Sequence, residues 1–263
     1  MNDIFKSLTA KEIILPEYFK DYEDGMRFFH NELTTLSTNI FIINKIRKFP
    51  FDLFCIPDDS TFFSMVINNF FEYSIIIISR LFKDTGKDCF TLPKFKKRII
   101  LKYIKPEYKR DFIDRIKEVN FKKLTADILN RIHELRNKRI AHNLEEFIKD
   151  PKNIRRINFN ELRQLQDCAN QLFDNLSFEI KYSMVLLPYN EEVIHPKDFD
   201  PRPDIEKILD CVAKESAFLN TPERYSKYPS VWISIKNNWS KETLNTFYKY
   251  RDKLGLPKYE RKK

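Results

Sequence analysis

An arginine, an amide and a histidine stand close together near the middle of the chain, in the segment 134–143. Arg136 is followed by Asn137, and His142 comes six residues after the arginine. These residue types could take part in chemistry, because a histidine can exchange a proton near neutral pH and an arginine can hold two oxygens of an anion. On an ideal helix, however, Arg136 and His142 point about 240° apart, and Arg139 is the nearer neighbour of the histidine. A solvated helical face with local ion pairs is therefore an alternative interpretation.

Other catalytic and metal-binding patterns are missing from the sequence. The four cysteines include no CxxC pair, which argues against a zinc site and a redox motif. His133 and Glu134 look like the start of HExxH, but Asn137 stands where the second histidine is required. With 3 glycines in 263 residues, no glycine-rich phosphate loop is present. We therefore expect neither a metal nor a cofactor.

Composition and charge favour a cytoplasmic protein with a polyanionic partner. Hydrophobic residues make up 42% and charged residues 32% of the chain, as in a globular protein. The net charge of +9 favours RNA or DNA over a membrane surface. The N-terminus has no signal-peptide pattern, and the cysteines suggest a reduced compartment. The apolar run 70–82 contains Glu72 and Arg80, so we expect a buried helix rather than a membrane span.

Apolar residues recur at helical spacing, so we predict an all-α bundle of long antiparallel helices. The first long helix is expected at 26–49, with six residues on its buried face: Phe29, Leu33, Leu36, Ile40, Ile43 and Ile46. The second, from about 60 to 83, is apolar on nearly all sides and is predicted to be central. Further helices are expected at 91–104, 106–119, 204–219 and 229–254. Another is expected to be capped by Thr125 and to bury Ile128, Ile132, Leu135 and Ile140. A long helix is expected from a cap at Asn158 or Asn160 through Leu187.

Three regions follow from this pattern. Residues 1–25 form a lead-in, 26–187 the helical bundle, and 188–263 a helical C-terminal extension that begins in a proline-rich segment. The aromatic residues of the extension give it enough apolar area to dock on the bundle or on a second copy. No internal repeat is evident.

The helices from 91 to 119 are strongly basic. Five cations there are candidate RNA contacts: Lys94, Lys96, Lys97, Arg98 and Lys102. Such residues give salt-dependent affinity for a phosphate backbone without reading sequence. A face whose charges only keep the protein soluble is an equally good explanation.

The run Leu135-Arg136-Asn137-Lys138-Arg139-Ile140-Ala141-His142 resembles the motif of the HEPN superfamily. Its residues are similar to those of the abortive-infection-like branch. The resemblance covers roughly residues 26–187. It implies a metal-independent endoribonuclease of a toxin or phage-defence system, acting as a homodimer on tRNA or mRNA. Two copies of the motif would form one cleft, in which His142 transfers protons, Arg136 holds the phosphate, and Asn137 and Arg139 support them.

The resemblance leaves alternatives open. HEPN-like bundles can also be non-catalytic modules that bind RNA or nucleotides or serve as scaffolds, and the aromatic extension can be the working surface of a purely structural partner. A defence-system partner or antitoxin is compatible with the family. However, Leu144 stands where some HEPN toxins carry a tyrosine that a partner nucleotidyltransferase modifies, which argues against that form of control.

Overall fold

The computed structural model describes most of the helical core of the chain. The described residues are 5, 8–49, 51, 61–83, 89–117, 121–137, 157–178, 202–215 and a few positions between 241 and 255. Contacts divide the chain into two compact units, one of residues 1–41 with 70–186 and one of 42–69 with 187–263. The fold is all-α, as predicted. Extended pairing within the described part is limited to an isolated bridge between Ile14 and Ile104.

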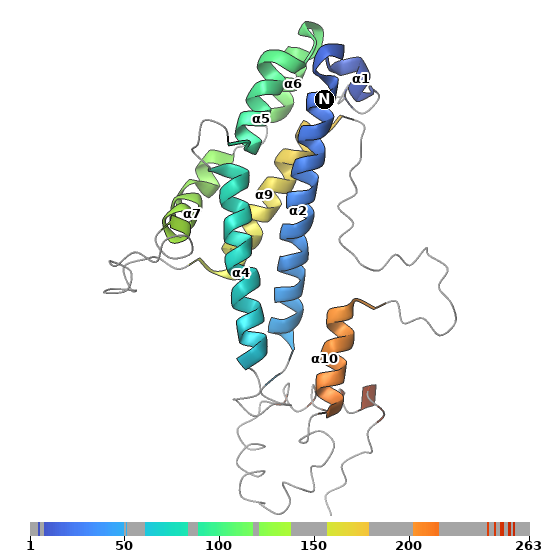
Figure 1. The fold of residues 1–263 in the computed structure, drawn as a ribbon, viewed down its shortest axis with the longest axis vertical. Helices are drawn as coiled ribbons and strands as arrows, with labels where there is room; N and C mark the ends of the chain where they lie inside the picture. Colours follow the sequence, from blue (N-terminus) through green and yellow to red (C-terminus); the bar gives the residue numbers. More distant parts are fainter. Residues whose placement is uncertain are drawn as a thin grey trace, which may run out of the picture. The chain divides into compact units, whose positions relative to one another are not determined.

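Figure 1 shows the helices of the described residues. In chain order they are α1 (Ala10–Ile13), α2 (Phe19–Lys48), α4 (Thr61–Phe82), α5 (Leu92–Arg98), α6 (Lys109–Lys117), α7 (Phe121–Leu135), α9 (Phe159–Leu176) and α10 (Asp204–Glu215). A π-helical turn, Ile99–Tyr103, continues α5. The helical run then ends before Pro106, as predicted, because proline has no N–H to donate to the preceding turn.

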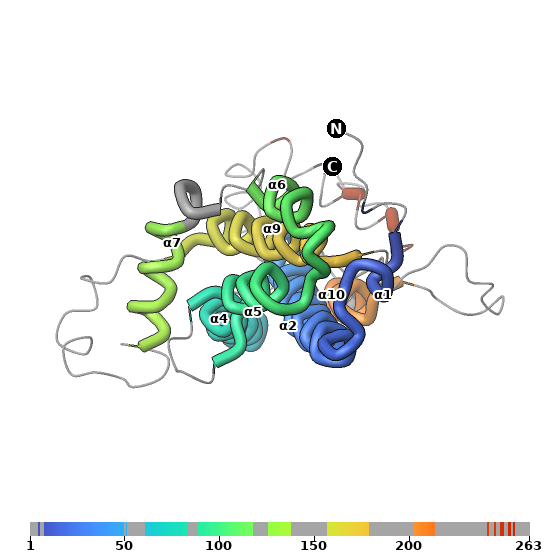
Figure 2. Tube along the Cα trace, turned by 90° about the horizontal axis from the view of Figure 1, so that it is seen from above, coloured from blue at the N-terminus to red at the C-terminus, as the bar shows by residue number. Residues whose placement is uncertain are grey.

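Polar contacts tie α2 to its two neighbours in the first unit. Near the start of α2, the Tyr22 hydroxyl donates to the carbonyl of Leu176 at the end of α9. Further along α2, Ser37 accepts from the side chain of Gln166, which lies earlier in α9. The two helices therefore run antiparallel. Arg80 of α4 forms a 3.0 Å ion pair with Glu32 of α2. Figures 1 and 2 show α4 between α2 and α7.

The apolar face predicted for the first long helix is confirmed. All six residues expected on it are buried: Phe29, Leu33, Leu36, Ile40, Ile43 and Ile46. The helix begins at Phe19 rather than at Met26, because Tyr22 and Met26 extend the same apolar stripe into the core. Gly25 lies within this added part, where its missing Cβ makes room for the ring of Phe95.

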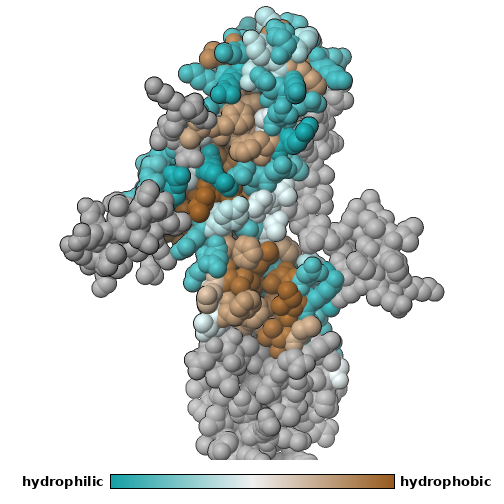
Figure 3. Space-filling model, in the orientation of Figure 1, coloured by the Kyte–Doolittle hydropathy of each residue, from teal (hydrophilic) through white to brown (hydrophobic). Residues whose placement is uncertain are grey.

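The prediction that α4 is buried on nearly all sides holds only for its C-terminal half. Ile75, Ile77, Ile78 and Leu81 are buried there, whereas Phe62 and Met65 are 65% and 59% exposed. Figure 3 shows apolar surface over this part of the molecule. By length and composition α4 is long and apolar enough to cross a membrane, and 28% of its most apolar 18-residue window is buried. Core helices of soluble proteins also meet this criterion.

The last long helix of the first unit ends earlier than the sequence pattern predicts. Asn158 caps α9 as expected, but Ser177 has extended backbone and the helix stops at Leu176 instead of continuing through Leu187. The Tyr22 hydroxyl donates to the Leu176 carbonyl at 2.9 Å and accepts from the Phe178 N–H at 3.2 Å. A tertiary contact therefore takes the backbone groups that a further helical turn would use.

Two segments share both a sequence and a conformation. Pro16–Tyr18 and Pro106–Tyr108 each read Pro-Glu-Tyr, and each forms one turn of 3-10 helix that leads directly into an α-helix, α2 in one case and α6 in the other. The aromatic residues at the matching positions Tyr22 and Phe112 are both fully buried. The expectation that the chain has no internal repeat is therefore wrong at this scale.

The two copies of this turn pair with each other through a reciprocal set of backbone hydrogen bonds. Leu15 N donates to Tyr103 O at 2.8 Å, and Lys105 N donates to Ile13 O at 3.0 Å. Exchanging each residue for its equivalent in the other copy maps one bond onto the other, so the pair has an approximate two-fold relation. It joins the start of α2 to the start of α6.

In the second unit, α10 is held by charged contacts. Glu206 of α10 forms an ion pair with Lys45 of α2. Asp210 is buried and is paired with Arg202 and, at 2.8 Å, with Lys253. Asp204, the first residue of α10, confirms the expected start of that helix.

Candidate functional site

The helix that leads into the predicted motif is α7, and its apolar face is buried. Ile128, Ile132 and Leu135 point into the core, as predicted. Thr125 does not cap the helix, because α7 already begins at Phe121 and Thr125 lies inside it. Apolar side chains that recur every three to four residues fix the rotation of α7, and hence the direction in which its last turn presents the motif.

A charge pair fastens α7 to α9. Arg131 donates to both oxygens of Glu161, at 2.6 Å and 3.3 Å, and also pairs with Asp127 at 2.9 Å. The hydrogen bonds that Arg131 donates to Glu161 lower the pKa of the Glu161 carboxyl and raise the pKa of Arg131. Glu161 also accepts from the N–H of Asn158 and so completes the capping box of α9. One carboxylate therefore starts α9 and holds α7 against it.

At its C-terminal end α7 widens into a π turn that contains Arg136 and Asn137. Single π turns within helices are frequent at functional sites, because they re-aim side chains relative to the preceding turns. Arg136 and Asn137 are both half-buried. Two of the predicted site residues are thus placed together at the end of a well-anchored helix.

The side chains at this end form a hydrogen-bonded chain. Arg136 Nη1 donates to Asn137 Oδ1 at 3.3 Å, and Asn137 Nδ2 lies 3.0 Å from Nε2 of His133. Sequence reasoning considered His133 only as a zinc ligand and rejected it. The signal that would have found this contact is the spacing of four residues between His133 and Asn137, which places the two side chains on one face of the helix.

The other two motif residues, Arg139 and His142, lie outside the described residues, as does Leu144. The roles predicted for them remain predictions. Within the described part of the chain, no group of histidine, cysteine, aspartate and glutamate side chains is arranged to hold a metal ion. Cys89, Cys168 and Cys211 are free thiols.

The five predicted RNA contacts have different environments. Lys97, Arg98 and Lys102 are exposed, whereas Lys94 and Lys96 are half-buried. Lys94 donates to the Cys89 carbonyl at 3.0 Å, so part of its capacity is used within the protein. Arg98 lies over the ring of Phe90, 5.2 Å from its centroid. The three exposed cations are the better placed for a phosphate backbone.

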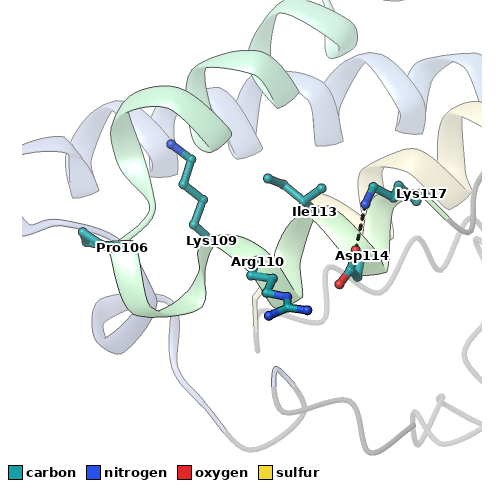
Figure 4. A pocket seen from close by; sticks show the side chains of 6 residues that line it. All are labelled: Pro106, Lys109, Arg110, Ile113, Asp114 and Lys117. Carbon is teal, nitrogen blue, oxygen red and sulfur yellow. Dashed lines mark hydrogen bonds and ion pairs between the residues drawn. The ribbon is translucent and has the colours of Figure 1, made fainter.

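The adjacent helix α6 carries a basic hollow of about 490 Å³. Figure 4 shows the side chains that line it: Pro106, Lys109, Arg110, Ile113, Asp114 and Lys117. Lys117 is paired with Asp114 at 2.9 Å. Lys109 and Arg110 add two further cations, so the lining carries a net positive charge. This hollow extends the basic region beyond the five residues singled out from the sequence.

The comparisons with known proteins identify the family. The sequence model of the AbiU2 family of HEPN proteins matches residues 57–198, which is more than half of the chain and runs from before α4 to beyond α9. No curated protein and no solved structure matches the chain. The match covers α7 and the segment 134–143, and it agrees with the resemblance to the abortive-infection-like branch. The chain belongs to the AbiU2 family of HEPN proteins.

Proposed function

We propose that this protein is a metal-independent endoribonuclease of an abortive-infection or toxin system. The observation that carries the proposal is the placement of Arg136 and Asn137, joined by a hydrogen bond, in the π turn that ends α7. Membership of a HEPN family supports the proposal, and so does the resemblance of the run from Leu135 to His142 to the superfamily motif.

In the proposed reaction the RNA supplies its own nucleophile. A base removes the proton of the 2′-hydroxyl, and the 2′-oxygen forms a bond to phosphorus while the bond from phosphorus to the 5′-oxygen breaks. An acid protonates the departing 5′-oxygen, which leaves a 2′,3′-cyclic phosphate on one fragment and a 5′-hydroxyl on the other. No metal or second substrate is required.

Arg136 is assigned to the phosphate and His142 to proton transfer. The arginine fork matches two non-bridging oxygens, whose negative charge grows as the new bond forms. One histidine cannot be base and acid in the same step, so a second copy of the chain would supply the other. We therefore propose a homodimer with a composite cleft.

The experiment that tests this function is cleavage of total tRNA and mRNA in EDTA. We expect fragments from the wild type and none from Arg136→Ala or His142→Ala. Arg163→Ala is the matched control, because Arg163 is an exposed arginine of α9; it should cleave as the wild type does. Cleavage that survives in His142→Ala would refute the assignment of the histidine.

A non-catalytic RNA-binding module is the second candidate, and the basic hollow on α6 favours it. We expect Lys109→Ala with Arg110→Ala to weaken RNA binding. The slope of log K against log salt should fall by about 0.7 for each phosphate of single-stranded RNA that the variant no longer neutralises. Lys20→Ala is the control, because Lys20 is exposed at the position that matches Arg110 in the other Pro-Glu-Tyr copy. RNA binding without cleavage that is weakened in the α6 variant and unchanged in Lys20→Ala would favour this second function.

A further inference from the structure

The hydrogen bonds at the end of α7 follow an order that the chemistry of the side chains fixes. A guanidinium can only donate, so the oxygen of the Asn137 amide must face Arg136, 3.3 Å away. The amide nitrogen then faces His133, whose Nε2 lies 3.0 Å from it. An amide NH₂ group can only donate, and Nε2 must therefore be the unprotonated, accepting nitrogen. In the neutral ring the proton is on Nδ1.

We propose that His133 is a positioning residue for Arg136. His133 accepts from Asn137 and so holds the amide in the one orientation that presents an oxygen to the guanidinium. The inference rests on the proposed function, because Arg136 is the residue assigned to the scissile phosphate. It adds to the motif a histidine that stands before the arginine.

The alternative orientation of the amide explains why the accepting nitrogen matters. A donor at position 133 would favour an Asn137 amide turned by 180°, in which the NH₂ group and the guanidinium face each other as two donors and move apart. With no partner at position 133, the amide would lose one of the two contacts that hold it and would fix the guanidinium less firmly. Displacing a substrate-positioning group by about 1 Å can cost roughly 100-fold in rate. A loss of about 10-fold to 100-fold in kcat is therefore expected when the acceptor is removed.

The anchoring of α7 does not depend on His133. The helix is held by its buried face and by the pair of Arg131 with Glu161, whereas His133 itself is half-buried. Variants at position 133 should therefore fold, and the loss of Arg136 orientation can be measured in a folded protein.

Two substitutions separate the acceptor from the shape of the side chain. His133→Gln supplies a carbonyl oxygen that can accept from Asn137, whereas His133→Phe keeps a flat ring without an acceptor. We expect His133→Gln to retain kcat within about threefold, and His133→Phe to lower kcat by about 10-fold to 100-fold with KM nearly unchanged. Equal losses in both variants, or a change in KM alone, would overturn the proposal.

The dependence on Asn137 is tested by a double-mutant cycle. If His133 acts only through Asn137, then His133→Phe combined with Asn137→Ala should cleave no more slowly than Asn137→Ala alone. Losses that multiply would show that His133 acts by another route and would contradict the positioning role.

A measurement without RNA distinguishes failure of this inference from failure of the proposed function. Long-range ¹⁵N–¹H NMR spectra of the full chain report which imidazole nitrogen carries the proton. We expect the His133 ring to be the Nδ1–H tautomer in the wild type, and Asn137→Ala to shift its Nε2 resonance. A protonated Nε2 would overturn the inference. The expected tautomer in a protein that cleaves no RNA would leave the hydrogen-bonded chain intact and refute the nuclease proposal instead.

Discussion

Replacing Glu161 by glutamine tests how firmly α7 is fastened to α9. Glutamine can still accept from the N–H of Asn158, so the capping box is kept while the negative charge opposite Arg131 is lost. The substitution therefore removes the charge that faces Arg131, together with the interaction of that charge with the N-terminal end of α9. Asn158→Ala is the complementary control, since it removes the cap and leaves the pair in place.

The expected cost follows from the geometry of the pair. Arg131 meets both oxygens of Glu161, and the two side chains are only 14% and 21% exposed, so the pair lies at the strong end of the range for surface ion pairs. Asp127 remains as a partner for Arg131 and limits the loss. We expect Glu161→Gln to lower the free energy of unfolding by about 1–2 kcal/mol at pH 7, or the melting temperature by roughly 2–8 °C.

The stability difference between the wild type and Glu161→Gln should depend on pH. The pKa of Glu161 is lower in the folded protein, so its stabilisation is complete above the unfolded pKa of about 4.3 and is lost as the pH falls through the folded value. Thermal unfolding of wild type and Glu161→Gln from pH 7 to pH 3 should show a gap that closes only below about pH 4.3. A gap that is absent at pH 7, or that stays constant in acid, would refute the reasoning.

Two further substitutions test the packing around the start of α2. Tyr22→Phe removes the hydroxyl that bonds both the Leu176 carbonyl and the Phe178 N–H. At about 1–3 kcal/mol for each of these two buried backbone groups left unpaired, chemical denaturation should show a loss of about 2–6 kcal/mol. A loss below about 1 kcal/mol would contradict this expectation. Gly25→Ala gains about 1 kcal/mol of helix propensity, but its Cβ would lie 2.5 Å from Cε2 of Phe95. We expect overpacking to prevail and the melting temperature to fall; a rise would show that the Phe95 ring yields easily.

Local patterns in the sequence predicted much of the bundle. The apolar stripe from Phe29 to Ile46 is expressed in the spacing of the residues themselves, and so is the cap at Asn158 with Glu161 three residues later. These features depend on contacts within one helix or on burial of one face. Both can therefore be predicted from the sequence before the fold is known.

The features that sequence reasoning missed depend on contacts between distant residues. The end of α9 is set by the hydroxyl of Tyr22, which is 154 residues from Leu176 in the sequence. The uneven burial of α4 does not follow from its residue types, since both halves are rich in apolar residues. Thr125 was expected to cap α7 because it is a good capping residue, yet the helix begins four residues earlier.

The site was predictable in part for the same reason. Residue types and spacing pointed to Arg136 and Asn137, which the structure places together at the end of α7. The part played by His133 was missed because a histidine was sought as a metal ligand or catalyst, and its contact with the Asn137 amide appears only when the last turn of the helix is seen.

The chemical nature of the RNA ends tests the central claim most directly. Purified protein is incubated with RNA in EDTA, and the new ends are identified by mass spectrometry beside the Arg136→Ala variant. The account predicts 2′,3′-cyclic phosphate and 5′-hydroxyl ends that form with the wild type and not with the variant. Ends with a 3′-hydroxyl and a 5′-phosphate, or fragments that form equally well with Arg136→Ala, would contradict it.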